Sequence, residues 1–178
     1  MKAMIQDNIV RLCIEGDEQA QYRFYQQYAK AMFNICIRML NDFDLAEDAL
    51  QDAFISAFKN LPTFKGDAPV GAWLKRIVVN TCLNYLKKRS IEIVNVENIG
   101  KIPVYEEEPT DYTEIDFEIE KVKQGIRQLP SGFRVVLSLY LIEGYDHKEI
   151  AEILNISEST SKSQYNRAKK KLRDILKK

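Results

Sequence analysis

Residues 145–172, YDHKEIAEILNISESTSKSQYNRAKKKL, carry the pattern that decides the fold of the C-terminal part of the chain. A short apolar-periodic segment with Ile150 and Ala151 is followed by Asn155, and a longer amphipathic segment begins after Ser157. The small Ala151 lets two helices cross closely, Asn155 tolerates the left-handed backbone of a tight helix exit, and Ser157 is a favoured N-cap. The spacing predicts a helix-turn-helix.

The second helix of this pattern, expected over 158–177, has two chemically different sides. The side predicted to be buried carries Ser161, Tyr165, Ala168, Leu172 and Ile175. We expect the Ser161 hydroxyl to bond back to the Ser157 carbonyl. The other side is cationic and hydrogen-bonding, which suits base edges and phosphates in a major groove. A solvated basic face is the alternative for one such helix, but the preceding turn and short helix favour DNA. The residues predicted to contact duplex DNA are Ser157, Glu158, Ser159, Thr160, Lys162, Ser163, Gln164, Asn166, Arg167 and Lys170.

An acidic segment over 44–54 predicts a protein-docking surface. Its polar residues recur every three or four positions and so share one broad helix face, with an expected capping box between Asp44 and Glu47. Such a face is unsuited to DNA but can dock on a basic protein surface. A solvated acidic face is the alternative, and a metal site is disfavoured because carboxylates on one straight helix do not surround an ion. The predicted docking residues are Asp44, Glu47, Asp48, Gln51, Asp52 and Phe54.

Residues 61–89 combine aromatic, amide and cationic side chains, which suits single-stranded DNA. A loop over 62–67 precedes a predicted helix on which polar residues recur every four positions. Core packing is the favoured alternative for the ring of Trp73. The residues predicted to contact a single strand are Phe64, Lys65, Gly66, Asp67, Trp73, Arg76, Asn80, Asn84, Lys87, Lys88 and Arg89.

The whole chain predicts an all-α fold with two small helical domains, 1–89 and 118–178, joined by an acidic linker over 90–117. Its 178 residues have a formal net charge of zero, but bases and acids are segregated along the chain, which indicates separate basic and acidic faces. Three widely spaced cysteines are expected to be buried free thiols. We expect helices at 5–15, 18–40, 44–60, 69–89, 115–128, 131–143, 147–154 and 158–177.

The C-terminal domain resembles region 4 of the extracytoplasmic-function (ECF) class of bacterial sigma factors. The resemblance implies recognition of the −35 promoter element by the helix-turn-helix and contact with the flap of RNA polymerase. The family often has glycine at Asn155 and Ser159, valine at Ser161 and arginine at Gln164, so the −35 sequence does not carry over. The matching residues are Leu129-Pro130, Phe133-Arg134-Val135-Val136-Leu137, Glu143-Gly144-Tyr145, Glu149-Ile150-Ala151-Glu152-Ile153-Leu154, Ile156-Ser157, Thr160, Lys162-Ser163, Arg167-Ala168 and Leu172.

The N-terminal domain resembles region 2 of the same family. The resemblance implies that the acidic helix binds the clamp coiled coil of the polymerase, and that the following loop and helix melt and read the −10 element. It also implies an anti-sigma partner, and a linker that passes through the RNA exit path, where Glu106, Glu107 and Glu108 could mimic the transcript. The matching residues are Phe24-Tyr25, Tyr28, Asp44, Ala46-Glu47-Asp48, Gln51-Asp52, Phe54, Ala57-Phe58, Leu61, Phe64, Trp73-Leu74, Ile77, Asn80, Tyr85-Leu86 and Arg89.

Two other functions remain as alternatives. An enzyme is disfavoured because the chain has a single histidine, His147, and no recognisable nucleotide-binding or catalytic motif. A conventional helix-turn-helix regulator would bind duplex DNA as a symmetric dimer, but the acidic helix and the single-strand pattern favour a sigma factor. We expect no cofactor or metal, no membrane insertion and a cytoplasmic location, with core RNA polymerase, promoter DNA and an anti-sigma factor as partners.

Overall fold

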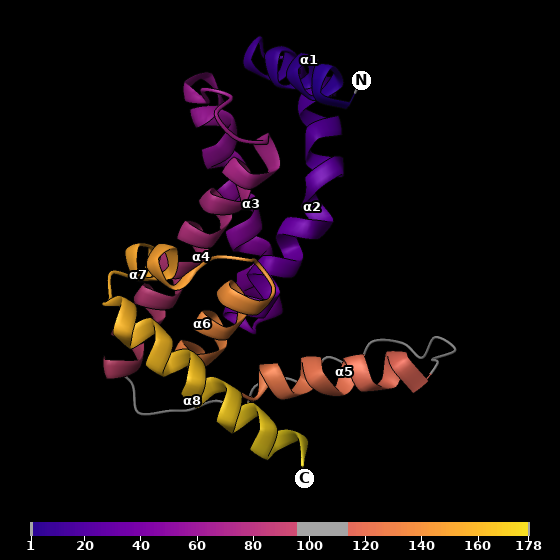
Figure 1. Cartoon of the computed structure of the whole chain (residues 1–178). Helices are drawn as coiled ribbons and strands as arrows, with labels where there is room; N and C mark the ends of the chain where they lie inside the picture. Colours follow the sequence, from indigo (N-terminus) through magenta and orange to yellow (C-terminus); the bar gives the residue numbers. More distant parts are fainter. Residues whose placement is uncertain (1, 96–113, 178) are drawn as a thin grey trace. The chain divides into compact units, whose positions relative to one another are not determined.

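The computed structural model describes residues 2–95 and 114–177, and every regular element within these ranges is a helix (Figure 1). The predicted all-α fold class is therefore confirmed. The chain divides into two compact units, Met1–Asn98 and Ile99–Lys178. Each unit buries its own set of apolar side chains.

The first unit is built on three long helices that pack against one another: α2 (Glu18–Leu40), α3 (Phe43–Asn60) and α4 (Val70–Asn95). Helix α1 (Lys2–Ile14) packs on α2, and a short 3-10 helix, η1 (Leu61–Thr63), follows α3. Phe24, Met39, Leu74 and Val78 are among the large side chains that are fully buried. Apolar stripes on three helices thus meet in one core, as the helical periodicity predicts.

The connection between α2 and α3 takes only two residues. Asn41 ends α2 in the left-handed conformation with a φ of 54°. Asp42 then begins α3, and its carboxylate accepts a hydrogen bond from the backbone N–H of Leu45 at 3.2 Å. The predicted capping box between Asp44 and Glu47 is wrong, because the extended backbone of Asp42 places the N-cap two residues earlier and Asp44 lies in the first helical turn.

The cysteines Cys13, Cys36 and Cys82 are free and buried, as their apolar sequence context predicts. A hydrogen bond with the Cys36 thiol, together with burial, raises the pKa of the Cys82 thiol. Cys82 therefore stays protonated at neutral pH and behaves as a small apolar side chain in the contact of α4 with α2.

The second unit contains α5 (Glu114–Arg127), α6 (Ser131–Leu141), α7 (His147–Leu154) and α8 (Glu158–Leu176). Helix α8 contacts each of the other three helices. The core of the second unit includes Leu129, Leu137 and Ala168, with the partly buried Ile126 and Leu172 packed against them. Figure 1 shows α8 beginning near α7 and running past α6 toward the C-terminus.

Arg134 closes the junction between α5 and α6. Its side chain is buried, and its guanidinium Nη1 donates to the backbone carbonyls of Leu129 at 2.8 Å and Arg127 at 3.3 Å. These carbonyls lie at and just beyond the end of α5, where backbone acceptors lack helical partners. A buried cation therefore orients α5 against α6.

The helix boundaries agree with the predicted ones to within a few residues. The largest difference is at α4, which continues to Asn95 instead of ending at 89, while α5 begins at Glu114. Helical residues therefore occupy both ends of the range 90–117 that the sequence assigned to a linker. The prediction that Glu106, Glu107 and Glu108 mimic the transcript concerns residues that lie outside the described ranges.

The close approach of α5 to α8 gives a test of this packing. A Cβ added at Gly125 would stand 2.8 Å from Cδ1 of Leu172 and 3.2 Å from Cδ2 of Leu176. We expect Gly125→Ala to lower the free energy of unfolding by up to about 2 kcal/mol, because displacing the two leucine methyl groups costs about 1–3 kcal/mol and the gain in helix propensity returns about 1 kcal/mol. Chemical denaturation followed by circular dichroism measures this change.

The matched control is Gly132→Ala in α6. The nearest atom to its added Cβ is Oε1 of Gln164, at 3.9 Å. This substitution gains helix propensity without a clash and should raise the free energy of unfolding by up to about 1 kcal/mol. Equal effects of the two substitutions would contradict the close packing of α5 on α8.

Candidate nucleic-acid and protein interfaces

Helices α7 and α8 form the predicted helix-turn-helix. Asp146 caps α7 in a capping box: its carboxylate accepts from the N–H of Glu149, and the Glu149 carboxylate accepts from the N–H of Asp146, both at 2.8 Å. Asn155 ends α7 with a φ of 53°, and Ser157 caps α8 by accepting from the N–H of Thr160 at 3.0 Å. The local chemistry predicted for this turn is therefore present at each of these positions.

The faces of α8 separate as the sequence predicts. Ser161 and Ala168 are buried, and Tyr165, Leu172 and Ile175 are partly buried. Of the residues predicted to contact duplex DNA, Thr160 and Gln164 are partly buried. Those that are exposed are Ser157, Glu158, Ser159, Lys162, Ser163, Asn166, Arg167 and Lys170.

Several polar groups at the start of α8 bind one another. The ammonium of Lys162 lies 2.6 Å from the Glu158 carboxylate, and the hydrogen bond and charge of Lys162 lower the pKa of Glu158. The Ser157 hydroxyl lies 2.8 Å from the Ser159 hydroxyl and 2.7 Å from that of Thr160. Lys162 must therefore exchange Glu158 for a phosphate or base if it contacts DNA.

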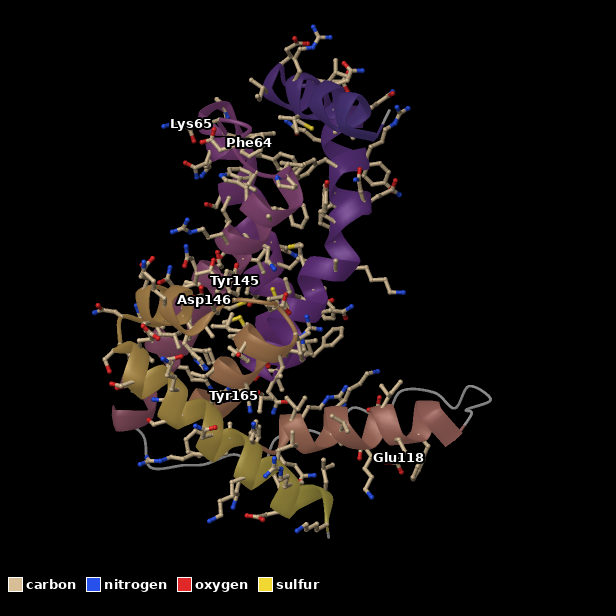
Figure 2. All side chains as sticks on the ribbon, in the orientation of Figure 1. Phe64, Lys65, Glu118, Tyr145, Asp146 and Tyr165 are labelled. Carbon is tan, nitrogen blue, oxygen red and sulfur yellow. The ribbon has the colours of Figure 1, made fainter. Side chains whose placement is uncertain are left out.

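His147 joins the two helices of the helix-turn-helix. Its ring Nδ1 lies 2.9 Å from the hydroxyl oxygen of Ser161, and its ring stacks on Tyr140 with centroids 4.4 Å apart. Tyr165 meets the same histidine edge to face at 5.6 Å (Tyr165 and Asp146 are labelled in Figure 2). The expected bond from Ser161 to the Ser157 carbonyl is therefore replaced by a bond to a side chain on α7.

Sequence reasoning used His147 only to argue against an enzyme and missed this contact. The available signal was Ser161 itself, a polar residue on a helix side otherwise predicted to be apolar. A buried hydroxyl requires a partner. The candidate partner was His147, which lies in the first turn of the preceding helix.

The acidic residues of α3 lie together on its exposed side. Asp44, Glu47, Asp48, Gln51 and Asp52 are all exposed. Their placement on one helix face agrees with the spacing argument. We call the surface formed by these five residues the acidic face.

Phe54, which the sequence predicts to be a docking residue, does not belong to the acidic face. Its side chain is only 3% exposed, and its ring packs against Tyr25 at 4.8 Å and Phe24 at 6.4 Å. It supports the face from inside the core. The neighbouring Ile55, which sequence reasoning passed over, is 52% exposed and lies one turn beyond Gln51 and Asp52, so it offers apolar surface beside the acidic face.

The loop before α4 and the polar side of α4 form the third candidate surface. Phe64 and Trp73 are both partly buried and pack against each other with ring centroids 5.3 Å apart. Figure 2 labels Phe64 and Lys65 at one end of the first unit. The ring of Trp73 therefore has a packing partner, as the favoured alternative expected, but part of it remains accessible.

The remaining predicted single-strand residues are exposed. Arg89 is partly engaged, because its guanidinium lies 3.5 Å from the carboxylate of Asp42 at the start of α3. This ion pair joins α4 to the N-terminus of α3. The exposed residues are Lys65, Gly66, Asp67, Arg76, Asn80, Asn84, Lys87, Lys88 and Arg89.

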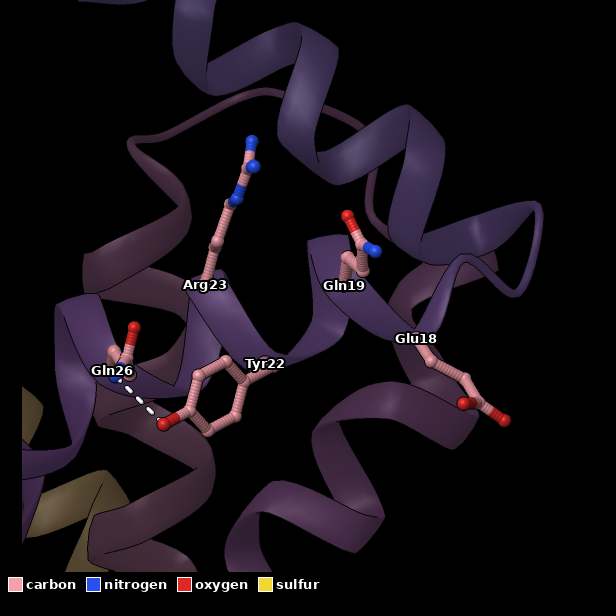
Figure 3. A pocket seen from close by; sticks show the side chains of 5 residues that line it. All are labelled: Glu18, Gln19, Tyr22, Arg23 and Gln26. Carbon is pink, nitrogen blue, oxygen red and sulfur yellow. Dashed lines mark hydrogen bonds between the residues drawn. The ribbon is translucent and has the colours of Figure 1, made fainter.

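A shallow hollow on the outer side of α2 lies apart from the predicted sites. It is lined by Glu18, Gln19, Tyr22, Arg23 and Gln26, and the Gln26 amide donates to the Tyr22 hydroxyl at 2.9 Å (Figure 3). Across residues 2–95 and 114–177, no cluster of three His, Cys, Asp or Glu side chains could bind a metal ion. None of the helices described in these ranges has the length and apolarity to cross a membrane.

The contact between His147 and Ser161 generates a stability test. We expect Ser161→Ala to lower the free energy of unfolding by about 1 kcal/mol, because it leaves a ring nitrogen of His147 without its partner. The control is Ser163→Ala, whose exposed hydroxyl donates to the Thr160 carbonyl and should change stability by less than about 0.5 kcal/mol. Similar losses in urea denaturation would contradict the importance of the buried bond.

Comparisons with known proteins agree with this arrangement. The family models for Sigma-70 region 2 and Sigma-70, region 4 match residues 24–91 and 119–172. The ECF RNA polymerase sigma factor SigW of Bacillus subtilis is 30% identical, over 99% of this chain and 98% of the relative. The RNA polymerase sigma-H factor of Pseudomonas aeruginosa is 31% identical, over 86% of this chain and 84% of the relative.

A solved structure is also similar. The sigma factor RpoE of Bartonella quintana, in complex with the anti-sigma factor NepR, has a TM-score of 0.66 and 25% sequence identity. The similarity covers 87% of this chain and 97% of that chain.

Proposed function

Because this chain belongs to the ECF class of the sigma-70 family, whose members bind core RNA polymerase and direct it to promoters, we propose that its three exposed surfaces divide promoter recognition among them. The observation that carries this division is the segregation of exposed chemistry. Acids gather on α3, amides and cations on α4 and its loop, and donors and cations on α8.

The acidic face of α3 is proposed to bind the clamp coiled coil of core polymerase. Its side chains are exposed and lie on one side of a helix whose opposite side is packed in the core. A carboxylate-rich surface repels DNA phosphates and attracts a basic protein surface. This attraction orients the two proteins and raises the rate at which they associate. Ile55, exposed beside the acids, supplies apolar area to the same contact.

The loop over 64–67 and the polar side of α4 are proposed to open and read the −10 element. Arg76, Asn80, Asn84 and Lys88 recur every four residues and are exposed, so they follow one line along the helix. Extruding a base costs on the order of a few kcal/mol, which stacking and hydrogen bonds must offset. The partly accessible rings of Phe64 and Trp73 lie near the start of that line.

Helix α8 is proposed to enter the major groove at the −35 element. Its exposed side carries Arg167, Asn166 and Lys170 among its donors, and the backbone N–H groups at a helix N-terminus favour binding of a phosphate. The contact between His147 and Ser161 fixes α8 against α7, so the reading side has a defined direction. The domains proposed are region 2 over 1–89 and region 4 over 118–178, joined by the range 90–117, in which 90–95 continue α4 and 114–117 begin α5.

We further propose that the protein has no catalytic activity of its own and works in the bacterial cytoplasm beside the polymerase. The relative of known structure from Bartonella quintana was solved bound to an anti-sigma factor. By similarity to it, we propose that an anti-sigma partner holds this chain until a signal, such as envelope stress, releases it.

Transcription with purified core polymerase tests the proposal. Fragmented DNA from the source organism is transcribed by core polymerase with and without this protein. We expect discrete new transcripts only when both are present, and their start sites define both promoter elements. Absence of initiation, together with protection of a symmetric duplex site without polymerase, would instead support a conventional dimeric regulator.

Substitutions on α4 and α8 should separate two steps of initiation. We expect Arg167→Ala to weaken closed-complex formation by the holoenzyme about tenfold, because a guanidinium contact to a base or phosphate is lost. We expect Asn80→Ala to leave closed complexes unchanged and to reduce strand opening about tenfold, since its amide would meet an unpaired base. Gel shifts and permanganate footprinting on one promoter measure the two steps.

Each of these variants is the control for the other. Both residues are exposed, so neither substitution should alter the thermal unfolding midpoint by more than a small amount. If both variants impaired the same step equally, the division of labour between α4 and α8 would be refuted.

A further inference from the structure

One member of the acidic face differs from the others. The carboxylate of Asp52 accepts a hydrogen bond from the hydroxyl of Tyr85 at 2.7 Å. For the side chains of Asp44, Glu47, Asp48 and Gln51, no hydrogen bond or ion pair occurs with the other residues that the structure describes. Among the described residues, Asp52 is thus the member of the acidic face that another side chain holds in place.

The residue that holds Asp52 comes from another helix. Tyr85 lies on α4, 33 positions along the chain from Asp52, and α4 packs directly against α3. The side chain of Tyr85 is partly buried, so packing holds it in place while its hydroxyl reaches the exposed Asp52. A phenol has only two rotatable side-chain bonds and loses little freedom when it is anchored in this way.

The bond uses one oxygen of the carboxylate. The hydroxyl contacts Oδ2, and a carboxylate can accept several hydrogen bonds through its two oxygens. Asp52 therefore keeps acceptor capacity for a cationic group of a partner. The exposed position of the carboxylate makes that capacity accessible.

Tyr85 keeps its donor proton over the physiological range. The hydrogen bond to Asp52, then burial and the nearby carboxylate charges of Asp52 and Asp48, raise the pKa of the phenol to about 12. Ionisation of the phenol would add a further negative charge beside the carboxylates of the acidic face. The phenol is therefore a donor wherever the cell operates.

We propose that Tyr85 is a positioning residue for polymerase binding, which holds the Asp52 carboxylate in the orientation that meets a basic group of the clamp. This inference rests on the proposed docking of the acidic face. A free surface carboxylate must lose side-chain freedom when it docks, whereas one already held does not, and this preorganisation strengthens binding. An exposed hydrogen bond contributes little to folding, so its effect belongs in the affinity rather than in stability.

The position of Tyr85 adds a geometric consequence. Its neighbour Asn84 belongs to the exposed polar line of α4 that is proposed to meet the single strand. Adjacent helical residues point about 100° apart, so one short segment of α4 presents a phenol toward α3 and an amide away from it. The polymerase contact and the strand contact are thereby held in a fixed relation.

A double-mutant cycle on the full chain tests the inference. The dissociation constant for core polymerase is measured by competition with a labelled sigma factor for wild type, Tyr85→Phe, Asp52→Ala and the double variant. We expect Tyr85→Phe to weaken binding about three- to tenfold, the size of one immobilised side chain. In the Asp52→Ala background it should have almost no further effect, because the carboxylate that it orients is gone.

Two controls separate positioning from a general loss of structure. Tyr22→Phe removes a hydroxyl of the same unit that accepts from Gln26 on the outer side of α2 (Figure 3) and should leave the affinity unchanged. The thermal unfolding midpoint of Tyr85→Phe should stay close to that of wild type. Unchanged affinity for Tyr85→Phe, or effects that simply multiply in the cycle, overturns the inference.

Asp48→Asn distinguishes this failure from failure of the docking surface itself. Asp48 belongs to the acidic face but is not bonded to Tyr85. If Asp48→Asn weakens binding while Tyr85→Phe does not, the acidic face is supported as the docking surface and the positioning role of Tyr85 is refuted. If neither Asp48→Asn nor Asp52→Ala changes the affinity, the proposed docking surface is wrong and the inference falls with it.

Discussion

The burial of one apolar stripe on each helix is the constraint on which the rest of this structure depends. Each unit is small, so its helices have only one side to bury and must leave the other in water. In the first unit, α4 buries Val70, Leu74, Val78 and Cys82 toward α2 and α3. That packing turns the polar line of α4 and the acidic face of α3 outward. The same constraint in the second unit exposes the donors of α8 once Ser161 and Ala168 are buried.

Opposite charges can coexist in this molecule because they are carried by different helices. A chain with zero formal net charge has no overall attraction to DNA. Acids concentrated on α3 and bases concentrated on α4 and α8 nevertheless create local potentials of opposite sign. A sigma factor needs both, since one surface must be attracted to a basic protein and another to a polyanion. The neutral total is therefore consistent with a protein that joins polymerase to promoter DNA.

Three polar contacts between helices give these surfaces their directions. His147 meets Ser161 between α7 and α8, Tyr85 meets Asp52 between α4 and α3, and Arg134 binds carbonyls at the end of α5. Apolar packing allows two helices to slide or rotate by small amounts, whereas a hydrogen bond has a narrow range of distances and angles. A few such bonds can therefore set the orientation of a helix that packing alone has brought into place.

The sequence by itself determined the all-α class, the helix-turn-helix with its caps at Asp146 and Ser157, and the exposed positions of the acidic and cationic residues. These features follow from local periodicity and from short-range capping chemistry, which involve residues only a few positions apart. The tertiary structure decided the rest. It buried Phe54 among Phe24 and Tyr25, moved the α3 cap to Asp42, paired His147 with Ser161 and placed Tyr85 on Asp52. Periodicity specifies which side of a helix is buried, but a contact between two helices depends on how they are packed against each other.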